Sequence, residues 1–350
     1  MKILNAIICL MLLNSCANIV MPTGGEKDAS SPILLQTLPE NNSVNFKNNR
    51  ITFVFNENIQ ENRWNDYFNI SPTTQKPVEY KISKNILTLL FDTELKDSTT
   101  FSVNLNSCIK DINEGNILEN LIYNFSTSNK IDSLEINGKV IDAQSLQGVS
   151  NAWVFLQNEE LVDSLCVNTK PIYVTKTNTD GTYYFNNLNE KSYKIFALDG
   201  VDLYYNKSDK IAFSTDLINA KIDSNKILYL FDPLYQHKTI EDSLLSKEKK
   251  TEDSGKIILD CITNDNLIIQ LYDEKKLINE YFFKYGPYVL NNISSGKYNL
   301  KVIVDSNKNN KWDTGNLKSQ ILPEKIIKIK DEINVRENWT LEVSCNLNEL

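Results

Sequence analysis

The chain has 350 residues, of which 41% are hydrophobic and 23% are charged, and its formal net charge is -8 at pH 7. These values are ordinary for packed globular structure of two or three domains, and the negative charge argues against a nucleic-acid or anionic-lipid surface. His237 is the single histidine and lies in a polar stretch without a nucleophile motif, so catalysis by a histidine base is disfavoured.

The N-terminus combines one positive charge, a short apolar run and a cysteine. Lys2 precedes the apolar residues 3–13, and Ser15 stands directly before Cys16. The run suits a secretory signal and is too short to span a bilayer, which needs about 20 residues. We therefore expect a lipoprotein signal peptide in residues 1–15 and lipidation at Cys16. The alternatives are an ordinary signal peptide with a chance cysteine, or a buried strand. Two or three acyl chains, palmitate among them, would anchor the protein stably.

Residues 16–31 are polar, contain a Gly-Gly pair and have no helical or strand periodicity. They predict a flexible, lipidated tether. In residues 32–128, apolar and polar residues alternate in short runs such as 51–55, 86–91 and 101–105. Clusters of Asn, Asp, Ser and Pro separate these runs, which indicates an antiparallel β-sandwich.

Several motifs of this first unit recur in one known family. They are residues 22–28, residues 51–57, the pair Ser71-Pro72, residues 109–116 and residues 125–127. In this order the segment 20–128 resembles a bacterial Ig-like domain of the S-layer type. The resemblance implies an architecture and an envelope location rather than an activity.

A second unit is expected at residues 133–232. Residues 138–142, 148–156 and 179–185, followed by Leu188 and Tyr193, resemble the carboxypeptidase regulatory-like, transthyretin-like β-sandwich. That module is an accessory, and the zinc ligands of the catalytic domain are not found in this sequence. Within it, Asp180-Gly181 predicts a tight turn with positive φ between two strands.

The remaining chain divides into a charged segment and a third apolar unit. Residues 236–254 predict a linker or a short solvated helix. Residues 255–346 contain further strand-like runs and predict a C-terminal β-sandwich. Residues 296–300 resemble the segment after the turn in the second unit, which indicates a degenerate repeat of that fold. The predicted fold class is therefore all-β, with serial Ig-like and transthyretin-like sandwiches on a lipidated tether.

Residues 305–315 have the spacing of a calcium loop. Oxygen-bearing side chains recur at Asp305, Asn307, Asn309 and Asp313, as in loops that wrap a hard cation. An EF-hand loop has Gly at its sixth position and Glu at its twelfth, where this sequence has Asn310 and Asn316. A calcium site here would therefore be weak. The alternative is a polar hairpin whose Asp and Asn side chains bond to their own backbone, and the sequence favours it.

Paired aromatic residues offer another kind of surface. They occur at residues 183–184, 204–205 and 281–283. Because neighbours on a strand point to opposite faces, one ring of each pair would pack inside and the other would be available to a sugar ring or a partner side chain. Core or edge packing is the favoured interpretation.

Two further patterns carry weaker hypotheses. Asp-Ser-Leu at Ser133, Ser164 and Ser243 resembles the acceptor of a bacterial periplasmic O-glycosylation system, although Asp-Ser also opens turns. Glu57, Asp111 and Glu114 would suit a carboxylate enzyme such as a glycosidase, but they are expected to be solvated loop residues.

The cysteines give neither a disulfide scaffold nor a zinc site. Cys108, Cys166, Cys261 and Cys345 are far apart in the sequence and form no CxxC pair. Cys261 and Cys345 fall in the same predicted unit, so they are either a disulfide formed in an oxidising compartment or small buried side chains.

These observations favour a non-catalytic outer-membrane lipoprotein. We expect it to act as a structural module, or as a module that binds an envelope protein or a glycan, without a cofactor except weakly bound calcium. The alternative is a cell-surface carbohydrate-capture accessory of a glycan-utilisation system. The periplasmic face and the cell surface remain equal alternatives.

Overall fold

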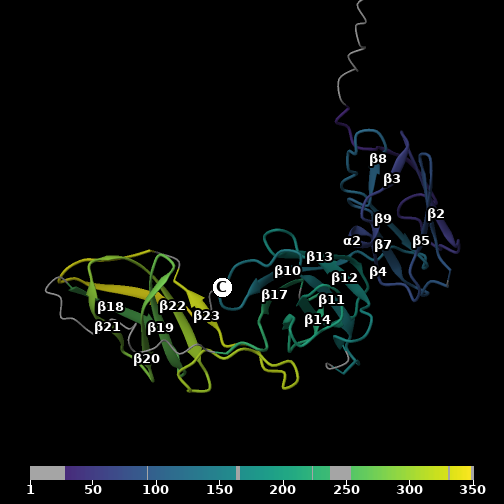
Figure 1. Cartoon of the computed structure of the whole chain (residues 1–350). Helices are drawn as coiled ribbons and strands as arrows, with labels where there is room; N and C mark the ends of the chain where they lie inside the picture. The colour runs from purple at the N-terminus through teal and green to yellow at the C-terminus, as the bar shows by residue number, and fades with distance from the viewer. Residues whose placement is uncertain are drawn as a thin grey trace, which may run out of the picture.

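The computed structural model describes residues 28–92, 94–162, 166–222, 224–236, 254–329 and 332–347. The predicted signal peptide, Cys16, most of the tether, nearly all of the predicted charged linker 236–254 with His237, and the two serines Ser164 and Ser243 lie outside the described residues. Three β-sandwiches follow one another along the chain, the first stacked on the second and the third beside the second (Figure 1). None of the helices in the described ranges has the length and apolar character needed to cross a membrane.

The first sandwich contains nine strands and one helical turn, with these bounds: β1 (Leu34–Leu38), β2 (Arg50–Phe55), β3 (Ile59–Glu61), α2 (Trp64–Tyr67), β4 (Asn69–Ser71), β5 (Glu79–Ser83), β6 (Ile86–Leu90), β7 (Thr100–Asn104), β8 (Ile109–Asp111) and β9 (Ile122–Ser126). The sheet β1-β2-β6-β5 packs against the sheet β4-β7-β9, and β3 pairs with β8. Every second residue of β2 is buried in the core of this sandwich, namely Ile51, Phe53 and Phe55. The predicted alternation of apolar and polar residues therefore identifies the face of β2 that packs inward.

The second sandwich has eight strands: β10 (Leu134–Asp142), β11 (Trp153–Asn158), β12 (Tyr173–Lys176), β13 (Thr182–Leu188), β14 (Ser192–Asp199), β15 (Lys210–Phe213), β16 (Ile218–Asn219) and β17 (Asn225–Leu230). The third also has eight: β18 (Ser254–Cys261), β19 (Asn266–Asp273), β20 (Lys276–Phe283), β21 (Tyr288–Ser294), β22 (Gly296–Asp305), β23 (Ile326–Lys328), β24 (Ile333–Val335) and β25 (Thr340–Cys345).

These two sandwiches have the same topology, strand for strand. The orders β13-β10-β17 and β12-β11-β14-β15 of the second correspond to β21-β18-β25 and β20-β19-β22-β23 of the third. In both, the first and last strands pair in parallel, and a short strand, β16 or β24, adds to the same central strand. The weak sequence echo at residues 296–300 therefore reflects a repeated fold.

The turn before β13 requires glycine. Gly181 has φ +87°, and a Cβ added there would lie 2.5 Å from the carbonyl oxygen of Val140. The Val140 N–H donates to the carbonyl oxygen of Gly181 at 2.9 Å, which ties this turn to β10. The predicted Asp180-Gly181 turn with positive φ is confirmed.

An apolar cluster joins the second and third sandwiches. Side chains on the outer face of the second sandwich, such as Phe155 and Phe196, are buried in one cluster with Ile268, Ile303 and Trp312 of the third. The loop after β22 reinforces the contact, since the Thr314 hydroxyl donates to the carbonyl oxygen of Asp232 at 2.6 Å. The two sandwiches thus share a core.

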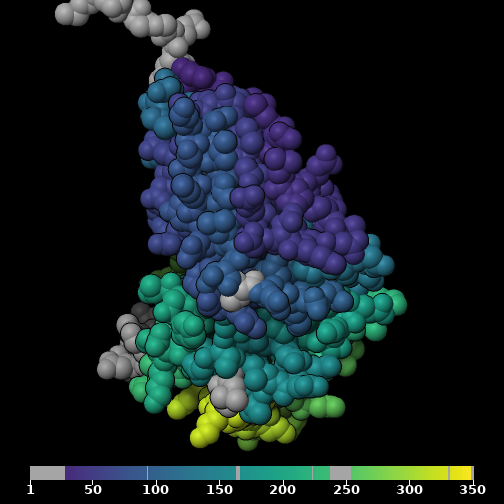
Figure 2. Space-filling model, turned by 90° about the vertical axis from the view of Figure 1, so that its right-hand side faces the viewer, coloured from purple at the N-terminus to yellow at the C-terminus, as the bar shows by residue number. Residues whose placement is uncertain are grey.

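The first and second sandwiches are joined mainly by hydrogen bonds between β4 and β12. The Asn69 side-chain amide donates to the carbonyl oxygen of Val174 at 2.8 Å, and the Val174 N–H donates to the Ser71 hydroxyl at 3.3 Å. The Thr73 N–H donates to the carbonyl oxygen of Ile172 at 2.7 Å. The space-filling view shows the first sandwich resting on the second along this boundary (Figure 2).

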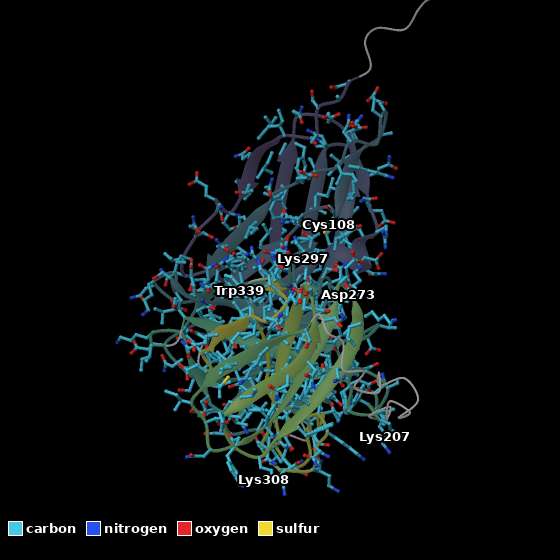
Figure 3. The ribbon with its side chains drawn as sticks, turned by 90° about the vertical axis from the view of Figure 1, so that its left-hand side faces the viewer. Cys108, Lys207, Asp273, Lys297, Lys308 and Trp339 are labelled. Atoms are coloured by element: carbon cyan, nitrogen blue, oxygen red, sulfur yellow. The ribbon has the colours of Figure 1, made fainter. Side chains whose placement is uncertain are left out.

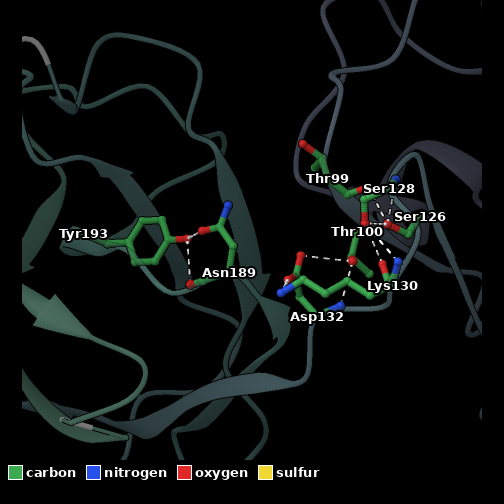
Figure 4. A network of polar contacts seen from close by, with 8 residues as sticks. All are labelled: Thr99, Thr100, Ser126, Ser128, Lys130, Asp132, Asn189 and Tyr193. Carbon is green, nitrogen blue, oxygen red and sulfur yellow. Dashed lines mark hydrogen bonds and ion pairs between the residues drawn. The ribbon is translucent and has the colours of Figure 1, made fainter. Parts of the chain in front are cut away.

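The segment between these sandwiches is also fixed. Asp132 donates its N–H to the Thr100 hydroxyl at 2.8 Å, and that hydroxyl donates to the Asp132 carboxylate at 3.1 Å (Figure 4). In the same view Tyr193 bonds to Asn189 in the second sandwich. The direction in which the chain leaves the first sandwich is therefore set by side-chain contacts.

Candidate functional site

A cleft lies where the first and second sandwiches meet. It has a volume of about 620 Å³, and its walls are α2 and β4 on one side and the ends of β11, β12 and β13 on the other. A second hollow of about 790 Å³ lies next to it and shares Thr73, Thr74 and Lys170 with it. Both volumes are in the range typical of small-molecule sites. Sequence analysis could not find this cleft, because its walls come from two units far apart in the chain.

Aromatic side chains reach the cleft from both sandwiches. Tyr184 is 55% exposed, whereas its neighbour Tyr183 is fully buried, which is the alternation expected for a pair on a strand. Tyr67, at the end of α2, is 37% exposed. Trp153 lines the same cleft and carries the Lys176 ammonium group 4.0 Å above its ring. The cleft therefore offers ring faces next to water.

The other predicted aromatic groups lie elsewhere. Tyr204 is 55% exposed on a loop of the second sandwich, and Phe282 is half exposed on β20 of the third. The residues beside them are partly buried, so each pair again divides between two environments. Neither group lines the junction cleft.

The predicted calcium loop is closed by hydrogen bonds of its own. Asp305 is completely buried, and its carboxylate accepts the N–H groups of Asn309 at 3.0 Å and Asn310 at 2.9 Å. The Asp313 carboxylate accepts the side-chain amides of Asn307 and Asn309. Lys308 projects from the tip of this loop (Figure 3). The carboxylate oxygen atoms of Asp305 and Asp313 hold the hairpin together. Calcium binding by this loop stays a prediction.

A residue that sequence analysis missed also holds this loop. The Glu324 carboxylate accepts the N–H groups of Ser306 at 2.8 Å and Asp313 at 3.1 Å. Burial raises the pKa of Glu324 above its ordinary value. Trp312 donates its indole N–H to the Glu324 carbonyl oxygen at 2.9 Å, so the loop and the shared core are fixed together. Within the described residues, no group of three or more His, Cys, Asp and Glu side chains is arranged to hold a metal ion.

The interpretation of Asp111 as a solvated loop residue was wrong. Asp111 is 1% exposed, and its carboxylate accepts the N–H groups of Glu114 at 2.7 Å, Gly115 at 2.8 Å and Asn116 at 3.0 Å. Burial alone would raise the pKa of Asp111, but these donors outweigh it and hold the pKa below its ordinary value. The Asp-x-x-Glu-Gly-Asn motif is thus a loop wrapped around a carboxylate, because that charge needs donors once it is buried.

The other two carboxylates of this group lie near the surface. Glu57 is partly buried and Glu114 is exposed. Partial burial, followed by the negative charges of Asp111 and Asp28, raises the pKa of Glu57. Asp28 and Ser31, from the predicted tether, contact the same end of the sandwich, where Asn116 donates to the Asp28 carbonyl oxygen at 3.0 Å.

Of the three predicted glycosylation serines, Ser133 lies in the described part of the chain. Its side chain is exposed at the junction between the first two sandwiches. The preceding Asp132 is held by Thr100, as described above. The Ser133 hydroxyl is therefore accessible on a fixed segment.

Cys261 and Cys345 face each other across two paired strands. They stand opposite in the parallel register of β18 and β25, and both thiols are free. The hydrogen bond between the two thiols raises the pKa of Cys261 and lowers that of Cys345. Cys108 and Cys166 are buried in other parts of the molecule.

The fold defines a multi-domain protein of serial β-sandwiches. Residues 28–127 match the family of the bacterial Ig-like domain, in agreement with the motifs at residues 51–57 and 109–116. Among curated protein sequences, none matches the chain.

Solved structures show similarity at a low level. The Bacillus anthracis TIE protein is 11% identical, with 93% of this chain and 59% of that one covered and a TM-score of 0.20. GBS52, the minor pilin of Streptococcus agalactiae, is 11% identical over 61% of this chain and 94% of the pilin, with a TM-score of 0.20. The L,D-transpeptidase from Mycobacterium smegmatis is 13% identical over 37% of this chain, with a TM-score of 0.21, and this chain spans 56% of its length. At these scores the structural similarities carry no argument about function.

Proposed function

We propose that this chain is a non-catalytic lipoprotein of the outer membrane, which serves as a structural or binding module of the cell envelope. The observation that carries the proposal is the continuity of the molecule. Hydrogen bonds join the first two sandwiches and a shared apolar core joins the last two, so the chain can hold a binding surface at a fixed distance from an anchor. The Ig-like match of residues 28–127 supports a structural role for the first sandwich.

The anchor in this proposal is Cys16. The sequence before it has the charge, apolar run and small residue of a lipoprotein signal, and acyl chains would hold the mature protein in the membrane. The partner is an envelope protein or a glycan, since the net charge of -8 disfavours nucleic acid.

Fractionation of cells tests the anchor. The wild-type protein should incorporate a labelled fatty acid and sediment with outer membranes, and Cys16→Ala should lose the label and leave the membrane fraction. A Cys9→Ala variant is the matched control, because Cys9 lies inside the signal, and it should behave as wild type. Membrane sedimentation of Cys16→Ala, or a wild-type protein without label, would refute the lipoprotein assignment.

Protease treatment of intact and permeabilised cells then decides the face of the membrane. Cleavage on intact cells would favour contact or glycan capture at the surface. Protection until permeabilisation would favour a scaffold in the periplasm. A protease-resistant pool in the cytoplasmic fraction would contradict both.

The second candidate function is carbohydrate capture for a glycan-utilisation system. The exposed ring of Tyr184 in the junction cleft is the observation that favours it. Saturable binding in a glycan panel would support this function, and a panel without binding would remove it.

Two smaller proposals accompany the main one. Ser133, Ser164 and Ser243 are proposed as O-glycosylation sites, which the intact mass of the native protein tests against the mass of a triple Ser→Ala variant. Asp305, Asn307, Asn309 and Asp313 are proposed as weak calcium ligands, which a calcium titration of the thermal midpoint tests, with magnesium as the control.

A further inference from the structure

We propose that the cleft between the first and second sandwiches is a binding site for a neutral oligosaccharide. The site consists of α2 and the residues after it in the first sandwich, and of the ends of β11, β12 and β13 in the second. This inference rests on the proposed role as an envelope binding module and names the ligand class of that module.

The walls of the cleft are fixed before any ligand enters. Asn69 and Ser71 of the first sandwich are bonded to Val174 of the second, and Thr73 is bonded to Ile172. Asn69, Thr73 and Val174 also line the cleft, so these contacts join its two sides. A preformed site avoids the entropic cost of ordering its walls on binding.

The ring faces match the apolar faces of a sugar. Tyr67 and Tyr184 come from opposite sides of the cleft and are both exposed, and Trp153, at the start of β11, belongs to the same lining. Lys176 covers part of the Trp153 ring. Exposed aromatic rings with one apolar face and a polar edge are suited to ligands that are apolar on one face and wet on the other.

Amide side chains match the hydroxyl groups of a sugar. The lining contains six asparagines, namely Asn65, Asn69, Asn104, Asn106, Asn151 and Asn178. Asn65 and Asn151 are exposed, and among the described residues their side chains have no protein partner. An amide both donates and accepts, as a sugar hydroxyl does, so the exposed amides of Asn65 and Asn151 suit a polyhydroxylated ligand.

Three charged residues line the cleft, and each has a partner within the protein. Asp66 is paired with Arg63 at 2.7 Å, and the Lys170 ammonium group is bonded to the Thr74 carbonyl oxygen. Lys176 lies on the Trp153 ring, so both lysines are already engaged by neutral groups of the protein, which favours a ligand that needs no ammonium partner.

The backbone of the cleft argues against a peptide that binds as an added strand. That mode needs an open strand edge. Here the edges of β4 and β12 face each other and are bonded together. The cleft presents side chains, which favours recognition of a sugar chain.

The test is isothermal titration of the full-length protein, in detergent, with defined neutral hexasaccharides. The probes are maltohexaose, cellohexaose, chitohexaose, xylohexaose and mannohexaose. We expect saturable binding of at least one of them. Tyr184→Ala should weaken that binding about tenfold, and Tyr184→Phe, which keeps the ring, should stay within about threefold of wild type.

Tyr204→Ala is the matched control. Tyr204 has the same 55% exposure as Tyr184, is in the same sandwich and lies outside the cleft lining, so this variant should bind as wild type. Equal weakening by Tyr184→Ala and Tyr204→Ala would overturn the site. Unchanged circular dichroism of each variant shows that a loss of binding is not a loss of folding.

Other outcomes have separate meanings. The inference is overturned if no hexasaccharide binds. It is also overturned if the cleft binds an acetylated octapeptide composed of Gly, Ser and Thr and none of the sugars. Cell fractionation is independent of this titration. A protein that binds sugar but is not anchored would refute the lipoprotein proposal alone. An anchored protein that binds no sugar would refute this inference and the carbohydrate-capture function, and would leave the lipoprotein proposal standing.

Discussion

Asp111 shows how a single residue explains a motif of the first sandwich. It ends β8, and the following loop turns back so that three of its N–H groups reach the carboxylate. Gly115 takes φ +80° in this loop, a conformation that favours glycine. The spacing of Asp, Glu, Gly and Asn is therefore dictated by the solvation of a buried charge.

A pH titration of stability tests this account. Because the folded protein holds the pKa of Asp111 below its unfolded value of about 3.9, ionised Asp111 stabilises the fold above that pH. This contribution is lost as the pH falls through the folded pKa. We expect Asp111→Asn to lower the free energy of unfolding at pH 7 and to have a smaller effect below about pH 4.

Glu114→Gln is the control for that titration, since Glu114 is exposed in the same loop. It removes a carboxylate without removing the acceptor of the three N–H groups, so its unfolding curve should follow wild type. Urea denaturation at several pH values measures both variants. A difference between Asp111→Asn and wild type that is constant with pH would contradict the role of the charge.

The two facing thiols lead to a prediction about oxidation. Adjacent strands are about 4.8 Å apart, which lies inside the Cα separation that a disulfide accepts. Cys261 and Cys345 are opposite each other and both point to the inner face of the third sandwich. We expect glutathione disulfide to oxidise the pair to an intramolecular disulfide, while two glutathione thiols are released.

Maleimide labelling in urea followed by mass spectrometry measures this oxidation. Cys108 is the internal control, because burial raises its pKa to about 12 and its thiol should stay reduced in the folded protein. The Cys345→Ser variant should leave Cys261 unpaired and sensitive to labelling. Oxidation of Cys108 at the rate of Cys261 would contradict the prediction.

At the scale of single elements, the loop of residues 305–313 is held by carboxylates. Asp305 is the last residue of β22 and caps two N–H groups, while Glu324 caps two more from outside the loop. We expect Asp305→Ala to lower the free energy of unfolding by about 2 kcal/mol, because the N–H groups of Asn309 and Asn310 lose their buried acceptor. Urea denaturation in EDTA measures this cost without any contribution from calcium.

Lys308→Ala is the control in the same loop, since that side chain projects into solvent (Figure 3). Its effect should be within about 0.5 kcal/mol of wild type. A loss of stability in Asp305→Ala that appears only when calcium is present would assign the loop to metal binding in place of self-capping.

The elements that sequence analysis predicted well are those with local causes. The alternation in β2, the turn at Gly181 and the division of Tyr183 and Tyr184 between two faces follow from strand geometry and from the freedom of glycine. The burial of Asp111 was missed because the spacing of its motif does not show which side chain turns inward. The contribution of Glu324 was missed because this residue lies outside the loop that it holds. The helical turn α2 was also missed, since its four residues are too few to show a helical period.

At the scale of the whole molecule, the junctions decide what the chain can do. The periodicity of β11 and β14 predicts strands with apolar residues on both faces, but it does not say what covers the outer face. In the structure the third sandwich covers this outer face. The ring of Trp312 packs edge-on against the ring of Tyr235, with 5.0 Å between the ring centroids. The junction cleft was likewise invisible from the sequence, because α2 and β13 are brought together only by the packing of two sandwiches.

Removal of the Trp312 ring tests whether the last two sandwiches unfold as one unit. Trp312 is buried in the shared core and its indole N–H is bonded to Glu324. We expect Trp312→Ala to cost about 3 kcal/mol and to separate the unfolding of the second and third sandwiches into two transitions. Hydrogen exchange measured for each sandwich along a urea series would detect the separation.

Trp339→Ala is the matched control, since Trp339 is 62% exposed on the same sandwich and lies outside the shared core (Figure 3). It should leave a single transition for the two sandwiches with nearly the wild-type midpoint. If Trp312→Ala behaved in the same way, the Trp312 ring would contribute little to the coupling, and the other residues of the shared core would hold the two sandwiches together. If only Trp312→Ala splits the transition, the third sandwich is held in a fixed orientation by its neighbour, and a ligand bound at the first junction is presented on a body of defined shape.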